Sequence, residues 1–243
     1  MTIKDIQVVV NKNLPVKLTP VKEKMDVYIP NIPEGISRRN GMIYLLCGSG
    51  GSGKTSLLLN MFKSSRLYRS KFHTIFYICP SSSFNSIEKH PFSDHDKVYH
   101  DLTVDLLSSI YDQLIEINEN SEEIEYACVI IDDFADVLKD NEIQLQLNKM
   151  IIKARHLHCS FIFSIQSYYY FPKLLRKQVT YMTMFKPKNT EEGLSICKEL
   201  LNLNKEDSLY LYNYVFDAPY THLDIDTTES KYYKNFNLMI IDK

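Results

Sequence analysis

The sequence predicts an α/β fold in which a doubly wound, mostly parallel sheet is flanked by helices. Short apolar runs alternate along the chain with segments whose apolar residues recur at helical intervals. Several runs are apolar throughout, as expected of strands that are buried on both faces of a parallel sheet. Two of them end in polar side chains, Asp132-Asp133 and Gln166, and a third leads into a glycine-rich stretch.

The elements follow in a regular order. Expected strands cover 42–47, 71–79, 97–99, 126–133, 160–165, 180–185 and 222–225, and expected helices follow the glycine stretch and cover 102–118, 142–157, 189–201 and 205–215. Polar residues precede the helix at 189, where Asn189 can cap the first turn and Glu191 and Glu192 suit its positive end. A tail at 236–241 completes the chain.

The first forty residues differ from the rest. They hold Pro15, Pro20, Pro30 and Pro33 and only short apolar pieces, which predicts an extended arm with one strand at 25–29. Residues 41–243 then form a single domain. The arm could pack on a neighbouring subunit or wrap around its own domain, and the sequence does not decide between them.

Composition restricts the class of protein. The 243 residues are 44% hydrophobic and 24% charged, as in a globular protein, with a net charge of -2. That charge gives no global nucleic-acid signature, so contact with DNA would need a local patch or a pore built by several subunits. No apolar run approaches the roughly 18 residues of a membrane helix, and we expect a cytosolic or nuclear location. Five scattered cysteines are expected to be reduced core residues.

The stretch 48–55 has the form G-x-x-x-x-G-K-[ST] between an expected strand and a helix, which is the P-loop pattern. Glycines let successive backbone N–H groups converge on phosphate oxygens at a helix N-terminus. Lys54 would reach the β- and γ-phosphates of ATP, and the Thr55 hydroxyl would bind Mg²⁺. The predicted nucleotide-binding residues are Gly48, Ser49, Gly50, Gly51, Ser52, Gly53, Lys54, Thr55 and Ser56.

The acidic strand end at 132–133 reads as a Walker B pattern. Asp132 would hold the hydrated Mg²⁺, and Asp133 would orient or deprotonate the attacking water. Alone, the two residues could equally form an Asx-type turn. Gln166 ends the next long strand, so its amide could bond the γ-phosphate or the water, although a strand end must become polar somewhere.

Two basic segments carry less specific signals. Tyr168 to Pro172 followed by Lys173, Arg176 and Lys177 mixes aromatic and cationic residues, as in surfaces that grip nucleic acids, or as in a loop packed by its own tyrosines. Arg66, Arg69 and Lys71 form a small cluster that is most simply a solvated face.

Together, Gly48 to Thr55, the strand 129–133, the stretch 154–157 leading into 160–166, and Pro172 with Leu175-Arg176 resemble the FtsK/HerA superfamily of DNA-pumping ATPases. Within it, the pattern is similar to the poxvirus-like genome-packaging ATPases of large DNA viruses and virophages. The likeness covers roughly 41–185 and implies a RecA/FtsK-like P-loop NTPase fold. FtsK-type motors often have Asp-Glu where this chain has Asp132-Asp133.

The resemblance implies a specific machine. An arginine before the sensor strand, here Arg155, would reach the nucleotide of the neighbouring subunit, with Arg176 as second choice. Arg155 could instead be a cation at a helix C-terminus. The resemblance further implies a homo-oligomeric ring, hexameric or pentameric, that uses ATP and Mg²⁺ to drive double-stranded DNA into a capsid. A capsid or membrane-vertex protein would be a partner, in the host cytoplasm (viral factory) or the virion.

Two other classes of protein remain open. A P-loop kinase of a small acceptor should show a lid with several arginines, and only scattered ones are present. A nucleotide-gated assembly protein without enzymatic activity would not need Asp133 or Arg155. A GTPase is disfavoured, since the segment 148–151 lacks the aspartate of the guanine-reading N-K-x-D sequence.

Overall fold

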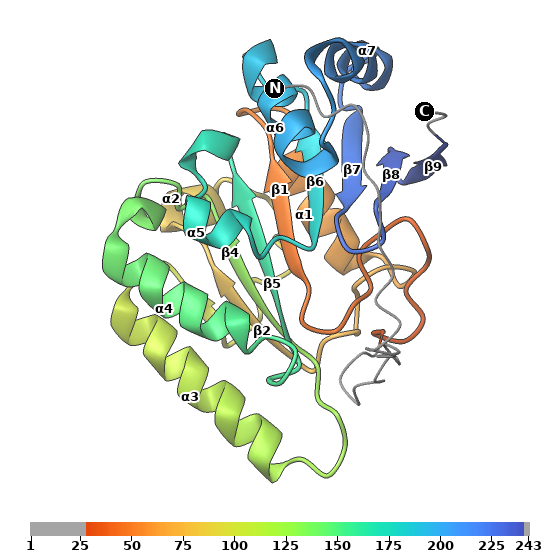
Figure 1. Ribbon diagram of the computed structural model, residues 1–243. Helices are drawn as coiled ribbons and strands as arrows, with labels where there is room; N and C mark the ends of the chain where they lie inside the picture. Colours follow the sequence, from red (N-terminus) through yellow and green to blue (C-terminus); the bar gives the residue numbers. More distant parts are fainter. Residues whose placement is uncertain (1–27, 241–243) are drawn as a thin grey trace, which may run out of the picture.

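The computed structural model describes residues 28–240, and nine strands form one mixed sheet within them (Figure 1). The sheet order is β3-β2-β4-β5-β1-β6-β7-β8-β9. The first six of these are parallel, and β7, β8 and β9 continue the sheet in antiparallel pairing. The strands are β1 (Ile43–Cys47), β2 (Thr74–Ile78), β3 (Val98–Tyr99), β4 (Ala127–Asp132), β5 (Cys159–Ile165), β6 (Tyr181–Phe185), β7 (His222–Asp226), β8 (Lys231–Lys234) and β9 (Asn237–Met239).

Helices cover both faces of this sheet, as a doubly wound fold requires (Figure 1). They are α1 (Lys54–Lys63), α2 (Ser81–Asn85), α3 (Val104–Asn120), α4 (Asn141–Ile152), α5 (Lys173–Arg176), α6 (Thr190–Leu201) and α7 (Lys205–Val215), with 3₁₀ turns at Val137–Lys139 and Tyr168–Tyr170. The predicted fold class is confirmed.

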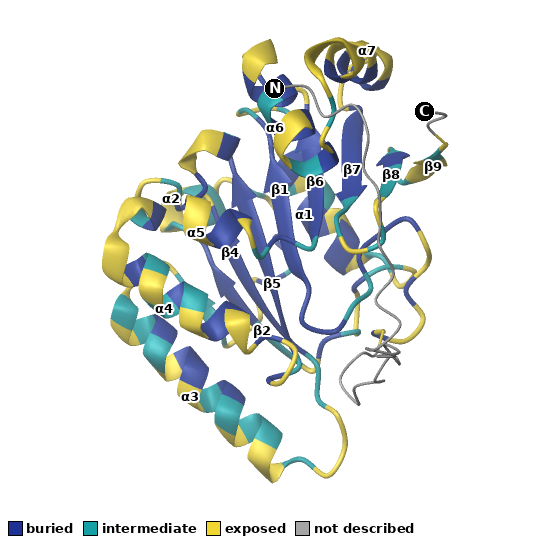
Figure 2. Ribbon diagram, in the orientation of Figure 1, coloured by how far each residue is buried: buried dark blue, intermediate teal, exposed yellow. Residues whose placement is uncertain are grey.

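The core divides into two clusters because strand side chains alternate between the two faces. On β1, Ile43 and Leu45 belong to the cluster beneath α3, α4 and α6, whereas Tyr44 and Leu46 belong to the cluster beneath α1. Every residue of β1, β4, β5 and β6 is buried, in agreement with the unbroken apolar runs in the sequence (Figure 2). All five cysteines are buried and free.

Part of the expected N-terminal arm packs on its own domain. Ile29, Ile32 and Ile36 are buried in the cluster beneath α1, and Tyr181 donates a hydrogen bond to the carbonyl of Gly35 at 2.6 Å. Most of the strand expected at 25–29 lies outside the described residues, and Tyr28 forms an isolated bridge with Arg39. The domain boundary at residue 40 stays a prediction.

Two expectations about elements differ from the structure. The helix expected over 142–157 ends at Ile152, and six residues of tight turn follow it before β5. Within the tail expected at 236–241, residue 241 lies outside the described residues, and residues 237–239 form β9, which pairs with β8 in a hairpin. Its two turn residues, Asn235 and Phe236, both adopt positive φ (51° and 64°), as a two-residue hairpin turn demands. Phenylalanine is rare in that conformation, and the backbone N–H of Phe236 is held by Asp224 at 2.9 Å.

Candidate functional site

The glycine-rich loop 48–53 joins β1 to α1 at the carboxyl edge of the parallel strands. Gly51 and Gly53 adopt φ of 77° and 104°, a left-handed region that favours glycine. A Cβ atom on Gly50 or Gly51 would meet no atom within 4 Å, so the loop borders open space. At the loop base the contact is close, because a Cβ on Gly48 would lie 2.7 Å from Cβ of Phe185 on β6. The loop therefore packs against β6 at Gly48 and borders open space at Gly50 and Gly51.

The N-terminus of α1 is available to an anion. Its N-cap, Gly53, makes no side-chain capping bond, and no acidic residue occupies the first turn. Helix N-termini leave several N–H groups unpaired, and such groups suit phosphate oxygens. Thr55 is half-buried and Ser56 is exposed in this first turn.

Lys54 is only 8% exposed although it carries a charge. Its Nζ donates a hydrogen bond to the carbonyl oxygen of Ser49 at 3.2 Å, so the side chain lies back along the loop. Burial lowers the pKa of Lys54, and the nearby carboxylates of Asp132 and Asp133 act in the opposite direction. A desolvated ammonium group with room for more partners is well suited to a phosphate oxygen.

Asp132 ends β4 and is 4% exposed. Tyr77 on β2 donates its hydroxyl to Oδ2 of Asp132 at 3.2 Å, and burial raises the pKa of this carboxyl group. In the described part of the chain, no group of three or more His, Cys, Asp and Glu residues could hold a metal by itself. A cation here would need further oxygens from Thr55, phosphate and water, which is how Mg²⁺ is commonly held beside nucleotides.

Asp133 follows β4 with φ of 64°, an uncommon conformation for a residue other than glycine. Both of its carboxylate oxygens accept hydrogen bonds from side chains on neighbouring segments. Nε2 of Gln166, after β5, donates to Oδ1 at 3.0 Å, and Oγ of Ser83, on α2, donates to Oδ2 at 2.9 Å. Asp133 is thus oriented from two sides, and Gln166 lies beside it as the strand order predicts.

Ser83 is the residue of this group that sequence reasoning missed. It comes from a serine-rich stretch after Pro80, which reads only as the end of a strand. The usable signal is topological, since β2 neighbours β4 and its carboxyl end lies beside Asp132 and Asp133.

Arg155 lies near the amino ends of the parallel strands, whereas the glycine loop lies at their carboxyl ends. It precedes β5, whose seven residues at ~3.3 Å each span about 20 Å. Its carbonyl oxygen accepts a hydrogen bond from Nδ2 of Asn40 at 3.3 Å, and a Cβ on Gly41 would lie 2.6 Å from its backbone nitrogen. The side chain is exposed. Arg155 and the glycine loop of the same chain therefore lie at opposite ends of the parallel strands.

Arg176, the second choice for such an arginine, is committed inside its own subunit. It is 8% exposed, donates to the carbonyls of Phe171 and Tyr168 at 2.8 and 2.7 Å, and lies 3.7 Å from Glu199. Its guanidinium also sits 4.2 Å from the centre of the Tyr168 ring. A role for Arg176 in a neighbouring subunit is therefore contradicted by its contacts. Tyr169 and Tyr170 of the same loop are about half exposed.

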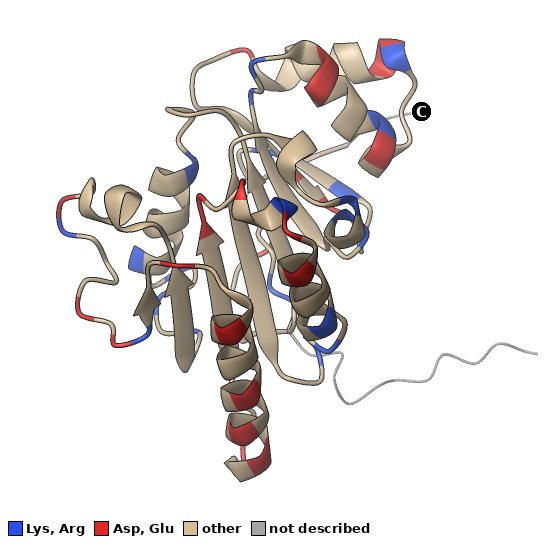
Figure 3. Ribbon diagram, turned by 90° about the vertical axis from the view of Figure 1, so that its left-hand side faces the viewer, with Lys and Arg blue, Asp and Glu red and all other residues tan. Residues whose placement is uncertain are grey.

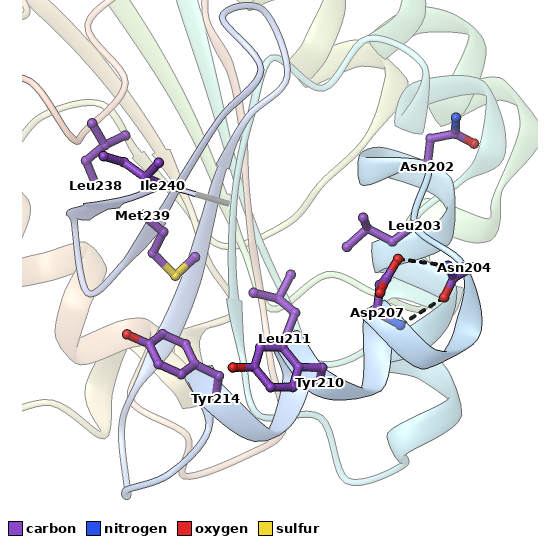
Figure 4. Close-up of a pocket in the computed structure, with 10 residues that line it drawn as sticks. All are labelled: Asn202, Leu203, Asn204, Asp207, Tyr210, Leu211, Tyr214, Leu238, Met239 and Ile240. Carbon is purple, nitrogen blue, oxygen red and sulfur yellow. Dashed lines mark hydrogen bonds between the residues drawn. The ribbon is translucent and has the colours of Figure 1, made fainter. Parts of the chain in front are cut away.

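A separate groove of about 1000 Å³ lies between α7 and β9 (Figure 4). Tyr210, Leu211 and Tyr214 of α7 line one wall, and the opposite wall comes from residues 238–240. Hydrogen bonds between Asn204 and Asp207 cap α7 at its end. None of the predicted nucleotide-site residues lines this groove.

The region 38–218, well over half of the chain, matches the family profile described as the poxvirus A32 protein. The chain belongs to the poxvirus A32 protein family. The kinship with poxvirus-like packaging ATPases that the motifs suggested is thereby confirmed. No curated protein sequence matches the chain.

Solved structures share the fold of this A32 family member. The DNA-packaging ATPase B204 from Sulfolobus turreted icosahedral virus is 16% identical with a TM-score of 0.60, covering 83% of this chain and 98% of that one. The genome-packaging NTPase B204 from Sulfolobus turreted icosahedral virus 2, in complex with AMPPCP, is 16% identical with a TM-score of 0.56, covering 81% and 97%. EccC (ATPases 2 and 3) from Thermomonospora curvata is 12% identical with a TM-score of 0.56, covering 86% and 39%. By family and by fold, the chain is a P-loop ATPase.

Proposed function

We propose that this protein hydrolyses ATP with Mg²⁺ and uses the energy to move double-stranded DNA into a viral capsid. The observation that carries the proposal is the meeting, at one edge of the sheet, of an uncapped glycine loop with the acidic pair Asp132 and Asp133. The family supports the genome-packaging task, and B204, the DNA-packaging ATPase from Sulfolobus turreted icosahedral virus, shares the fold.

The residues divide the chemistry of hydrolysis. Backbone N–H groups of the loop 48–53 bind the phosphates, and the Lys54 ammonium binds the terminal ones. Thr55 and Asp132 would hold Mg²⁺, which would neutralise charge on the phosphate oxygens. The Asp133 carboxylate accepts a hydrogen bond from the attacking water and takes its proton.

Gln166 lies beside Asp133, the proposed proton acceptor, and can contact the attacking water. Its amide donates to Asp133 at 3.0 Å, and the amide oxygen remains to position water. Asp133 accepts bonds at both oxygens, so the water must share or displace one of them before its proton can move. Each carboxylate oxygen keeps a second lone pair, so water can bind Asp133 beside Gln166 or Ser83.

Arg155 completes the site of a neighbouring copy in this proposal. An arginine supplied in this way stabilises the charge of the transition state and is worth about 10³- to 10⁵-fold in rate. Because Arg155 and its own loop lie at opposite ends of the parallel strands, the proposed assembly is a homo-oligomeric ring, a hexamer or pentamer, with ATP between subunits.

The charge pattern of the surface restricts where DNA can bind. The helix α3 carries Asp105, Asp112, Glu116 and Glu119 and no Lys or Arg (Figure 3). The acidic side chains of α3 would repel a phosphate backbone, although Lys149 and Lys153 beside it lie over the Tyr111 ring of α3. The exposed Arg66 and Arg69 belong to the loop whose Tyr68 and Phe72 pack in the cluster beneath α1, on the opposite face of the sheet. We assign DNA contact to that face or to the ring pore.

The remaining partners follow from the same proposal. A capsid or membrane-vertex protein would anchor the ring, and the work would take place in the host cytoplasm, at the viral factory, or in the virion. No helix within residues 28–240 combines the length and apolar character needed to cross a bilayer.

The test is ATP hydrolysis by the purified protein with and without duplex DNA. Lys54→Ala, Asp133→Ala and Arg155→Ala should each abolish DNA-stimulated turnover. Turnover that ignores DNA and survives Arg155→Ala would reject the ring motor. Phosphate transfer to a small acceptor would instead indicate a kinase, and nucleotide-dependent assembly without hydrolysis would indicate an assembly protein. Mass measurement with a nucleotide analogue should show the oligomer, and a strictly monomeric protein would count against it.

A further inference from the structure

Tyr220 is an exposed aromatic residue next to the glycine loop. It lies in the turn between α7 and β7 and is 72% exposed. A Cβ atom built on Gly53 would lie 3.4 Å from Cδ1 of Tyr220. The tyrosine ring therefore borders the first turn of α1 from outside the loop.

The turn that carries Tyr220 is held in place by the sheet. Tyr220 adopts φ of 63°, and Oγ1 of Thr221 closes the turn by donating to the carbonyl of Ala218 at 2.8 Å. His222 then begins β7 opposite Phe185 on β6, with their ring centroids 5.2 Å apart. Phe185 also contacts the loop, since a Cβ on Gly53 would lie 3.4 Å from its Cε1. A left-handed conformation costs a tyrosine free energy, and such residues gather at functional sites.

The strand order gives a bound triphosphate a direction. On one side of β1 lie β5 and β4, which end in Gln166 and in Asp132-Asp133. The terminal phosphate must face that side, where hydrolysis would occur. On the other side of β1 lie β6 and then β7, with Tyr220 just before it. The sugar and base, at the other end of the nucleotide, must leave the loop on the side of Tyr220.

We propose that Tyr220 is a base-contacting residue whose ring stacks on the base of the bound nucleoside triphosphate. The inference rests on the proposed nucleotide site and adds the surface that receives the base. The ring offers an apolar face at low conformational cost, and stacking tolerates any base. Purines, with the larger ring, should gain the most from this contact.

The first experiment separates the base from the phosphates. Affinities for ATP and for inorganic tripolyphosphate are measured on wild type, Tyr220→Ala and Tyr220→Phe. Loss of one stacked ring should weaken ATP binding about 5- to 100-fold in Tyr220→Ala, leave tripolyphosphate binding unchanged, and leave Tyr220→Phe close to wild type. Tyr210→Ala, which removes an equally exposed tyrosine of the α7 groove, is the matched control and should bind both as wild type does.

The second experiment uses fluorescence. The chain contains no tryptophan, so Tyr220→Trp introduces a single reporter at the site. Its emission should be quenched by ATP and GTP and unaffected by tripolyphosphate.

The outcomes separate this inference from the function on which it rests. Equal ATP affinity in wild type and Tyr220→Ala, or equal losses for ATP and tripolyphosphate, would overturn the stacking role and leave the phosphate site standing. A wild-type protein that binds neither ATP nor tripolyphosphate would overturn the nucleotide site and the stacking role with it.

Discussion

Replacing Arg176 by alanine should destabilise the fold, because this arginine holds the loop after β5 from inside. Its two hydrogen bonds, to the carbonyls of Phe171 and Tyr168, are short at 2.8 and 2.7 Å. Alanine removes both donors and leaves the two acceptors in a buried place. The ion pair with Glu199 is longer, at 3.7 Å, and its partner is half-exposed, so we assign little free energy to it.

The magnitude follows from the two bonds. A hydrogen bond from a charged donor contributes about 1.5–3 kcal/mol, and two of them predict a loss of about 3–5 kcal/mol after partial hydration of the acceptors. For a chain of this size each kcal/mol shifts Tm by roughly 2–4 °C, so Arg176→Ala should melt about 6–20 °C below wild type. Arg176→Lys keeps the charge but loses the planar guanidinium group that donates both hydrogen bonds. Its Tm should lie between those of wild type and Arg176→Ala.

The assay is thermal and urea unfolding, with Lys177→Ala as control, since this adjacent cation is exposed. The control should melt within about 2 °C of wild type, as most surface substitutions do. If Arg176→Ala unfolded like wild type but lost ATP hydrolysis, and hydrolysis returned on mixing with Lys54→Ala subunits, the internal role argued from its contacts would be refuted.

Three further predictions test the two ends of the parallel strands. Ser83→Ala removes one of the two hydrogen bonds that orient Asp133 and should lower kcat about 3- to 10-fold at unchanged KM for ATP. Ser83→Thr keeps a hydroxyl group and should stay close to wild type. An unchanged kcat in Ser83→Ala would show that Ser83 has no role in the site. Gly41→Ala, at φ of 66° and 2.6 Å from the backbone of Arg155, should cost more than about 1 kcal/mol in urea unfolding, and a neutral result would contradict that contact. An equal mixture of the inactive Lys54→Ala and Arg155→Ala subunits should regain about a quarter of wild-type turnover. In such a mixture, about a quarter of the interfaces combine an intact Lys54 from one subunit with an intact Arg155 from its neighbour. No recovery after subunit exchange would argue against a shared site.

Much of the site could be predicted because parallel strands end at one edge. A P-loop, an acidic strand end and Gln166 on the next strand must meet there if the strands are adjacent. The hydrogen bond between Gln166 and Asp133 agrees with that expectation. Ser83 contacts the same carboxylate from α2, fifty residues away in sequence, and no local pattern marks it.

Other features depend on tertiary contacts that periodicity does not show. Arg176 in sequence is a cation beside aromatic residues, and its burial follows from carbonyls and from Glu199 on another helix. The hairpin of β8 and β9 lacks the Asn-Gly signal that usually announces such a turn. Its turn is stabilised instead by Asp224, which is fully buried and accepts hydrogen bonds from Thr183 and from the N–H of Phe236.

The positions of Lys54 and Arg155 restrict the symmetry of any assembly in which both act on one nucleotide. They lie at opposite edges of the sheet, separated by the length of β5, so the loop edge of one copy must face the Arg155 edge of another. In a two-fold dimer the same surface of each copy faces the partner. For each copy to give its Arg155 to the other's loop, that one surface would have to include both ends of the strands, which lie on opposite sides of the domain. The contact must therefore join unlike surfaces. Such head-to-tail contacts repeat from copy to copy and give a ring where the rotation between copies closes, or an open filament where it does not. If Lys54 and Arg155 act on one nucleotide, their positions are therefore compatible with the proposed ring and not with a two-fold dimer.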